Sequence, residues 1–258
     1  MRSTRYAALS RFWPLSGALL PWLWAAAAGF ALSGLAVALL HAPADARQGD
    51  ADRIVCLHLP AAWMAMLIYL AMAAWAAIGW VGNVRLASML ARALAPTGSA
   101  CAALALVTAS LWGKATWGTW WVWDARLTAQ LILLLLYAGY LALVESIDDP
   151  RRADRAGALV AVVGAVNVPL IYFSLRWWST LHPGATSTPR PAPSIADGTL
   201  LGVALMTLAF WSWSFAIGFV RVRAIVLERE RDTEWVRALD APAPPAGATA
   251  ADLHGAAA

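Results

Sequence analysis

"LTAQLILLLLYAGYLALV", the run from Leu127 to Val144, carries no charged side chain. Its length is close to the roughly 20 apolar residues that a helix needs to cross the hydrocarbon core of a bilayer. Because the backbone groups of a segment in lipid must form their hydrogen bonds within that segment, the run is expected to be helical. The sequence therefore predicts a transmembrane helix at this position.

Five other runs have the same character, so the sequence predicts six membrane-spanning helices and an all-α, polytopic membrane protein. The composition agrees, since 61% of the 258 residues are hydrophobic and 13% are charged, a balance that a soluble globule could not bury. The first run also suits a cleaved secretory signal, but it is longer than the apolar part of such signals, which favours a span. The other five runs are residues 15–40, 61–81, 94–112, 158–175 and 200–220.

The basic residues predict the orientation of the chain. With six spans both termini lie on one side of the membrane, and that side then holds 13 of the 19 Lys and Arg residues. Since basic residues are enriched in cytoplasmic loops, the termini are predicted to be cytoplasmic. The net charge of +4 is explained as an orientation signal, and we expect no nucleic-acid partner.

Residues 1–240 are predicted to form one membrane domain, and residues 241–258 a disordered cytoplasmic tail. The tail, APAPPAGATAADLHGAAA, is rich in Ala and Pro and has no apolar periodicity. The sequence has no Walker motif or other strong catalytic signature, so we expect neither ATP hydrolysis nor catalytic residues in this chain. The outward-facing connections in this topology are residues 41–60, 113–126 and 176–199.

The connection between the third and fourth spans contains WGKATWGTWWVWDARLT, residues 112–128, which holds five of the 16 tryptophans. An aromatic belt at headgroup depth explains scattered tryptophans. It explains Trp120, Trp121 and Trp123 less well, because Gly118 interrupts any helix there and adjacent indoles must point in different directions. The alternative is a rigid apolar surface at the outer membrane face for a large planar ligand such as haem.

Two histidines flank this stretch. His58 precedes the second span, His182 follows the fifth, and both belong to outward connections. Two imidazoles that approach from opposite sides can supply both axial ligands of a haem iron. Arg53 and Arg126 are the nearest outward arginines; they are candidates for pairing with haem propionates, and phospholipid headgroups are their alternative partners. His41 is left without an assigned role.

Three further polar or helix-bending residues are given local structural roles. Asp124 is expected to cap the N-terminus of the fourth span or to pair with Arg126. Asn167 and Pro169, inside the fifth run, predict a kink with a polar patch that serves helix packing.

The string WGTWWVWDARLT resembles the WWD motif of haem-handling proteins, and the whole chain resembles the haem exporter protein C family of bacterial cytochrome c maturation. The similarity covers the six runs, LHLPAAW around His58, residues 112–128, and WWSTLHPG around His182. The family implies an external haem platform with His58 and His182 as the axial iron ligands, and haem b bound as cargo. The other residues implied to form the haem site are Trp117, Trp120, Trp121, Trp123, Asp124, Arg53 and Arg126.

The resemblance also implies partners and a location in the bacterial inner membrane. The partners would be a periplasmic haem chaperone that receives the haem covalently, the ATP-binding and membrane subunits of an ABC transporter, and a small membrane peptide. Two alternatives stay open. One is haem transport across the membrane, although no intramembrane charge or inverted repeat marks a path. The other is a stand-alone cytochrome c synthase, although such synthases usually have further spans and a large periplasmic domain.

Overall fold

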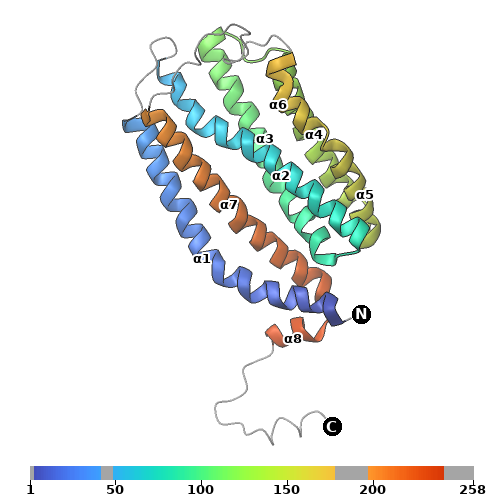
Figure 1. Cartoon of the computed structure of the whole chain (residues 1–258). Coiled ribbons are helices and arrows are strands. Elements are labelled where there is room, and N and C mark those ends of the chain that lie inside the picture. Colours follow the sequence, from blue (N-terminus) through green and yellow to red (C-terminus); the bar gives the residue numbers. More distant parts are fainter. Residues whose placement is uncertain (1–2, 42–48, 178–196, 241–258) are drawn as a thin grey trace, which may run out of the picture.

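The computed structural model describes residues 3–41, 49–177 and 197–240, and every regular element in these ranges is a helix (Figure 1). Six helical segments are long and apolar enough to cross a membrane. The prediction of an all-α, polytopic membrane protein with six spans is therefore confirmed. His182 and the predicted tail at residues 241–258 lie outside the described residues.

The helices are longer than the apolar runs in the sequence, because backbone hydrogen bonding continues past the apolar part into the flanking polar residues. In chain order they are α1 (Ser3–Leu40), the 3-10 turn η1 (Asp50–Ile54), α2 (Val55–Gly82), α3 (Arg85–Trp117), α4 (Ala125–Glu145), α5 (Pro150–Gly164), α6 (Asn167–Trp177), α7 (Asp197–Glu230) and the short α8 (Glu234–Asp240).

The bundle is built around the pair α2 and α3, which pack along each other, with α4, α5 and α6 on one side and α7 on the other. α1 packs mainly on α7, at the edge of the bundle (Figure 1). In the core, Tyr69 and Tyr137 form an edge-to-face pair with centroids 4.9 Å apart. Each ring lies against a glycine, Gly164 and Gly98 respectively, where a Cβ atom would collide with the phenol. These glycines therefore set how closely the helices approach.

The bundle has two ends that differ in composition. We call the Trp end the one at which α1, α3 and α6 finish and α2, α4 and α7 begin; it lies at the top of Figure 1. At the opposite end, the terminal end, ion pairs tie the helices together. Arg229 of α7 makes two hydrogen bonds, of 2.8 and 3.0 Å, to the carboxylate of Asp154 in α5. Arg85 of α3 pairs with the buried Glu230 of α7.

The placement of His58 in a connection ahead of the second span was wrong. α2 begins at Val55, directly after η1, so His58 lies in the first turn of the helix. The later start followed from hydropathy, because the apolar run in the sequence begins only at residue 61. Pro60 is the sixth residue of α2, beyond the first turn, and the helix continues through it at the cost of one backbone hydrogen bond. As a result His58 is held by regular helical backbone.

The fifth run is divided into two helices, and the break lies where the sequence predicted a kink. α5 ends at Gly164 and α6 begins at Asn167. The side-chain amide of Asn167 donates a 2.9 Å hydrogen bond to the backbone carbonyl of Ala129 in α4. The prediction that Asn167 serves helix packing is confirmed.

Candidate functional site

The tryptophan stretch begins with the end of α3. Gly118 follows the helix in the left-handed conformation, with φ of 75°, which glycine adopts at little cost. Its N–H donates to the carbonyl of Lys114, and the Lys114 ammonium donates in turn to the Gly118 carbonyl at 3.0 Å. The helix is thus stopped at the position where the sequence placed an interruption.

A tight turn separates the indoles beyond Gly118. The Thr119 hydroxyl donates to the carbonyl of Trp121 at 3.0 Å and accepts from its N–H at 3.4 Å. The neighbouring indole of Trp120 is 57% exposed, and that of Trp123 is 77% exposed. Lys114 lies 5.9 Å from the centroid of the Trp120 ring, within range of a cation–π interaction. Two large apolar rings therefore remain uncovered by the described residues at the Trp end.

Trp121 is the indole that anchors the turn to the bundle. It packs against a small buried cluster formed by Leu106 and Ala109 of α3 and Leu127 of α4. It also meets Trp123 edge to face, with centroids 5.4 Å apart. Its Nε1 is buried and has no hydrogen-bond partner among the described residues. Farther back, Trp112 and Trp117 form a second edge-to-face pair at 5.2 Å.

Asp124 is the N-cap of α4, as expected. Its Oδ1 accepts a 2.7 Å hydrogen bond from the backbone N–H of Leu127. A carboxylate at this position satisfies one of the unpaired N–H groups and complements the positive end of the helix dipole. The cap fixes the direction in which α4 leaves the tryptophan turn.

His58 projects from α2 toward α3. Its Nδ1 lies 3.1 Å from the carbonyl oxygen of Ala105 and 3.0 Å from the hydroxyl of Thr108. Thr108 has its own acceptor, the carbonyl of Leu104 at 2.7 Å. Because a carbonyl oxygen can only accept, Nδ1 must carry the proton, and Nε2 of the neutral ring carries the lone pair. This is the tautomer that a metal-binding histidine needs for ligation through Nε2.

Next to His58 is a hollow between α2, α3, α4 and α6. We call it the His58 hollow; its volume is about 20 Å³. Two polar residues of α4 join His58 in its wall, Arg126 and Gln130. Leu106, Ala109 and Leu127, which support Trp121, also line it. The same three side chains therefore connect the tryptophan turn to the histidine.

The predicted site residues are thus brought together in part. His58, Arg126, Trp121 and Asp124 belong to one continuous patch at the Trp end. Arg53, in η1, is 29% exposed and forms an ion pair with Asp50 at 3.2 Å. His182 falls outside the described residues, so the structure says nothing about its position.

Two residues of this patch were not identified from the sequence, Thr108 and Gln130. Thr108 fixes the His58 ring from the neighbouring helix, a relation across 50 residues that no local pattern reveals. Gln130 left a weak signal, because it is the single amide in the run from Leu127 to Val144. It also follows Arg126 by four residues, the spacing of neighbours on one helix face.

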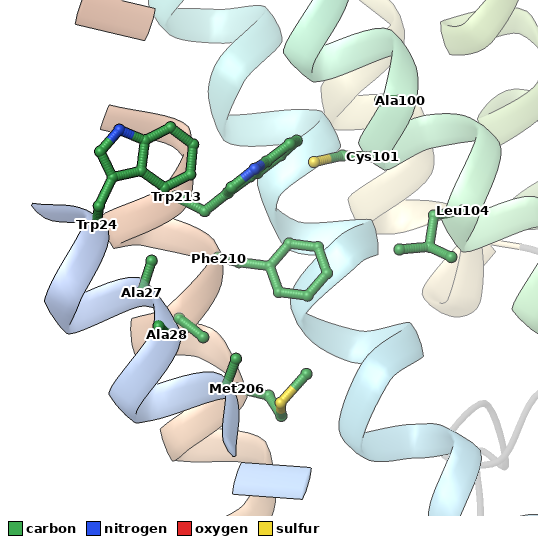
Figure 2. Close-up of a pocket in the computed structure, with 11 residues that line it drawn as sticks. Trp24, Ala27, Ala28, Ala100, Cys101, Leu104, Met206, Phe210 and Trp213 are labelled. Carbon is green, nitrogen blue, oxygen red and sulfur yellow. The ribbon is translucent and has the colours of Figure 1, made fainter. Parts of the chain in front are cut away.

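A larger cavity lies away from this patch, between the middle parts of α1, α3 and α7 (Figure 2). Its volume is about 420 Å³. Trp24, Cys101, Phe210 and Trp213 contribute to a lining that is almost wholly apolar, with no imidazole or charged side chain among the described residues. The cavity suits hydrocarbon, and none of the predicted site residues that the structure describes lines it.

The chain is similar to known proteins over nearly its whole length. The model of a family described as heme exporter protein C matches residues 2–237. Heme exporter protein C of Escherichia coli (strain K12) is 41% identical over 229 residues, which are 89% of this chain and 92% of the relative. The protein of that name from Bradyrhizobium diazoefficiens is 40% identical over 220 residues, covering 85% and 83% of the two chains. That from Rhodobacter capsulatus is 34% identical over 225 residues, covering 87% and 93%.

Proposed function

The chain belongs to the heme exporter protein C family, and from this premise we propose that it handles haem for cytochrome c maturation. Haem b is its cargo, bound at the Trp end with His58 and His182 as axial iron ligands. The protein delivers the haem to a periplasmic haem chaperone. It works beside the ATP-binding and membrane subunits of an ABC transporter and a small membrane peptide. ATP hydrolysis takes place in those subunits.

The observation that carries the proposal is the hydrogen bonding of His58. With Nδ1 held by the Ala105 carbonyl and facing Thr108, the imidazole is fixed in the tautomer that presents Nε2 to a metal. The ring is also fixed in direction, because both partners belong to α3.

The exposed indoles of Trp120 and Trp123 support the proposal of a haem platform. Aromatic rings offer large rigid contact area to a flat ligand and lose little conformational entropy when it binds. Trp121 has a different role, since its packing on Leu106, Ala109 and Leu127 holds the turn in place. Asp124 contributes by positioning, because it caps the helix that follows.

Arg126 is the better supported of the two predicted propionate partners. It lines the His58 hollow, so an anionic group near His58 would meet its guanidinium in a region of low dielectric, where ion pairs are strong. Arg53 already pairs with Asp50. We assign it to the rim of the site, where it can exchange Asp50 for a propionate.

The distribution of charge supports an orientation with the Trp end in the periplasm and both termini in the cytoplasm. The described arginines gather at the terminal end, where the ion pairs of Arg85 and Arg229 join α3, α5 and α7. Basic residues are enriched on the cytoplasmic side of inner-membrane proteins. The proposed haem platform then faces the compartment of the chaperone.

Transport of haem through this chain is the second candidate, and the apolar cavity in the middle of the bundle is the feature that favours it. The cavity lies between α1, α3 and α7 (Figure 2). The described residues that line it offer no imidazole for iron and no cation for propionates. The Trp end offers both an imidazole and a cation, so we prefer a haem platform there to transport through the cavity.

The test is a delivery experiment. Detergent-purified protein is loaded with haem and mixed with the membrane-anchored periplasmic chaperone, and haem is measured on each after separation. Wild type should bind haem and transfer it, and His58→Ala should retain and transfer less. His41→Ala is the matched control, because His41 follows α1 at the same end and is exposed; it should behave as wild type. Wild-type behaviour of both His58→Ala and His182→Ala would refute the ligand assignment.

A further inference from the structure

Gln130 is a buried polar residue to which the proposed function gives no role. It is 7% exposed, and its side-chain nitrogen has no hydrogen-bond partner among the described residues. A buried amide donor without a partner is costly, so most such groups in folded proteins are paired with protein, water or a ligand. Two neighbouring polar side chains have partners: Thr108 bonds to Leu104, and Asp124 to Leu127. The side-chain nitrogen of Gln130 is therefore a hydrogen-bond donor that a ligand could satisfy.

The position of Gln130 indicates what that partner is. Gln130 lines the His58 hollow one helical turn below Arg126, on the same face of α4. Together they present a guanidinium and an amide, which supply hydrogen-bond donors to one small space. Among the described residues, no acidic side chain lines the hollow. The space therefore suits an anionic oxygen.

The size of the hollow limits which anion can enter. About 20 Å³ is room for one water-sized group, so the hollow can take a single carboxylate oxygen but neither a porphyrin ring nor a tetrahedral phosphate. The remaining wall is apolar, formed by residues such as Ala62, Met66 and Ile171. Apolar walls strengthen the attraction between Arg126 and an anion, because they keep the local dielectric low.

We propose that Gln130 and Arg126 form a carboxylate pocket beside His58 and that Gln130 is a specificity-determining residue of the haem site. The inference rests on the proposed function, and it deepens it by adding Gln130 to Arg126 as a second partner of one haem propionate, which is inserted between the two side chains. The amide of Gln130 then donates to the carboxylate and Arg126 neutralises it. The pocket makes the site selective for haem with free propionates.

The test compares haem with haem dimethyl ester, which has the same iron and porphyrin but no carboxylate. Binding of each is titrated to detergent-purified wild type and to Gln130→Leu and Gln130→Glu. Thr97→Val is the matched control. Thr97 is also buried with an unpaired side-chain oxygen, and it lies in α3 away from the hollow. Thermal unfolding of every variant is recorded so that a loss of fold is detected.

Gln130→Leu should weaken the binding of haem about tenfold, the effect of losing a hydrogen bond to a charged group, and leave the binding of the diester unchanged. Gln130→Glu should weaken haem binding further, because it places a second carboxylate beside the propionate, and should bind the diester as wild type does. Thr97→Val should bind both ligands as wild type does.

Two results would overturn the inference while the proposed function stands. Unchanged haem binding in Gln130→Leu would mean that the hollow holds only a water molecule. Equal losses for haem and diester would make Gln130 a packing residue. If wild type binds neither ligand, the proposed function fails and the carboxylate pocket fails with it.

Discussion

At the scale of single residues, the site depends on how neighbouring helices restrain His58. Its Nδ1 has a backbone carbonyl and a hydroxyl within hydrogen-bond distance, both from α3. The carbonyl sets the tautomer, while the Thr108 hydroxyl restricts the rotation of the ring. Residues that touch neither iron nor porphyrin can thus influence how firmly the haem is held.

Removing the Thr108 hydroxyl should loosen the imidazole without displacing it. Thr108→Val is expected to weaken haem binding about two- to fivefold, since the Ala105 carbonyl still holds Nδ1. Titration of haem into the purified variant measures this. Thr207→Val is the control, because Thr207 of α7 also donates to the carbonyl four residues before it. A loss of the same size in both variants would show a general effect of the substitution on helix packing.

The two central indoles should respond differently to truncation. Trp120→Ala is expected to lower haem affinity about two- to tenfold, through lost stacking, with no change in thermal stability, because the ring is exposed. Trp121→Ala should lower haem affinity and also reduce stability by about 2 kcal/mol, because the ring packs on the cluster below it. Unchanged haem binding in both variants would show that these rings belong to an interfacial aromatic belt and not to a haem platform.

At the scale of elements, the junction between α3 and α4 positions the site. α3 is stopped by Gly118 in the left-handed conformation, and α4 is started by the Asp124 cap. These two signals fix the length and direction of the tryptophan turn. They also place Arg126 and Gln130 in the first turns of α4, where they face His58.

Loss of the Asp124 cap should disturb both the helix and the site. Asp124→Ala is expected to cost about 0.5–2 kcal/mol of stability and to weaken haem binding by shifting Arg126. Asp124→Asn, which retains the cap, should restore both. Asp149→Ala is a control at the terminal end, since Asp149 caps α5 with a similar 2.7 Å bond; it should lose stability and bind haem normally. Failure of Asn to rescue would indicate a direct role for the charge.

The sequence was sufficient to predict these local signals and insufficient for the contacts across the bundle. Gly118 and Asp124 can be recognised from the sequence, because a helix stop and an N-cap depend on adjacent residues. The start of α2 was placed too late, because hydropathy marks the apolar part of a helix and misses the polar turns that continue its hydrogen bonding. Thr108 and Gln130 could not be assigned, since their roles depend on how α2, α3 and α4 pack.

At the scale of the whole molecule, the two ends have opposite chemistry. Uncovered indoles and a donor-lined hollow occupy the Trp end, and ion pairs among α3, α5 and α7 secure the terminal end. The gathering of basic residues at the terminal end is the part of this asymmetry that six spans and the positive-inside rule led us to expect. The proposed direction of haem delivery follows from it.

The orientation can be checked by labelling single cysteines in spheroplasts with a membrane-impermeant maleimide. Ala115→Cys, exposed near the end of α3, should react from outside. Ser146→Cys, exposed after α4 at the terminal end, should react only after the membrane is permeabilised. Background labelling should be low, because Cys56 and Cys101 are buried. The reverse pattern would place the Trp end in the cytoplasm and rule out direct delivery to a periplasmic chaperone.

The most direct measurement of the central claim is the absorption spectrum of the detergent-purified, haem-loaded protein, oxidised and then reduced. It should be recorded for wild type beside the His58→Ala, His182→Ala double variant. We expect wild type to give the spectrum of a six-coordinate haem with two histidine ligands, and we expect the variant to lose it. An unchanged spectrum in the double variant, or a wild type that binds no added haem, would contradict a haem platform with two histidine ligands.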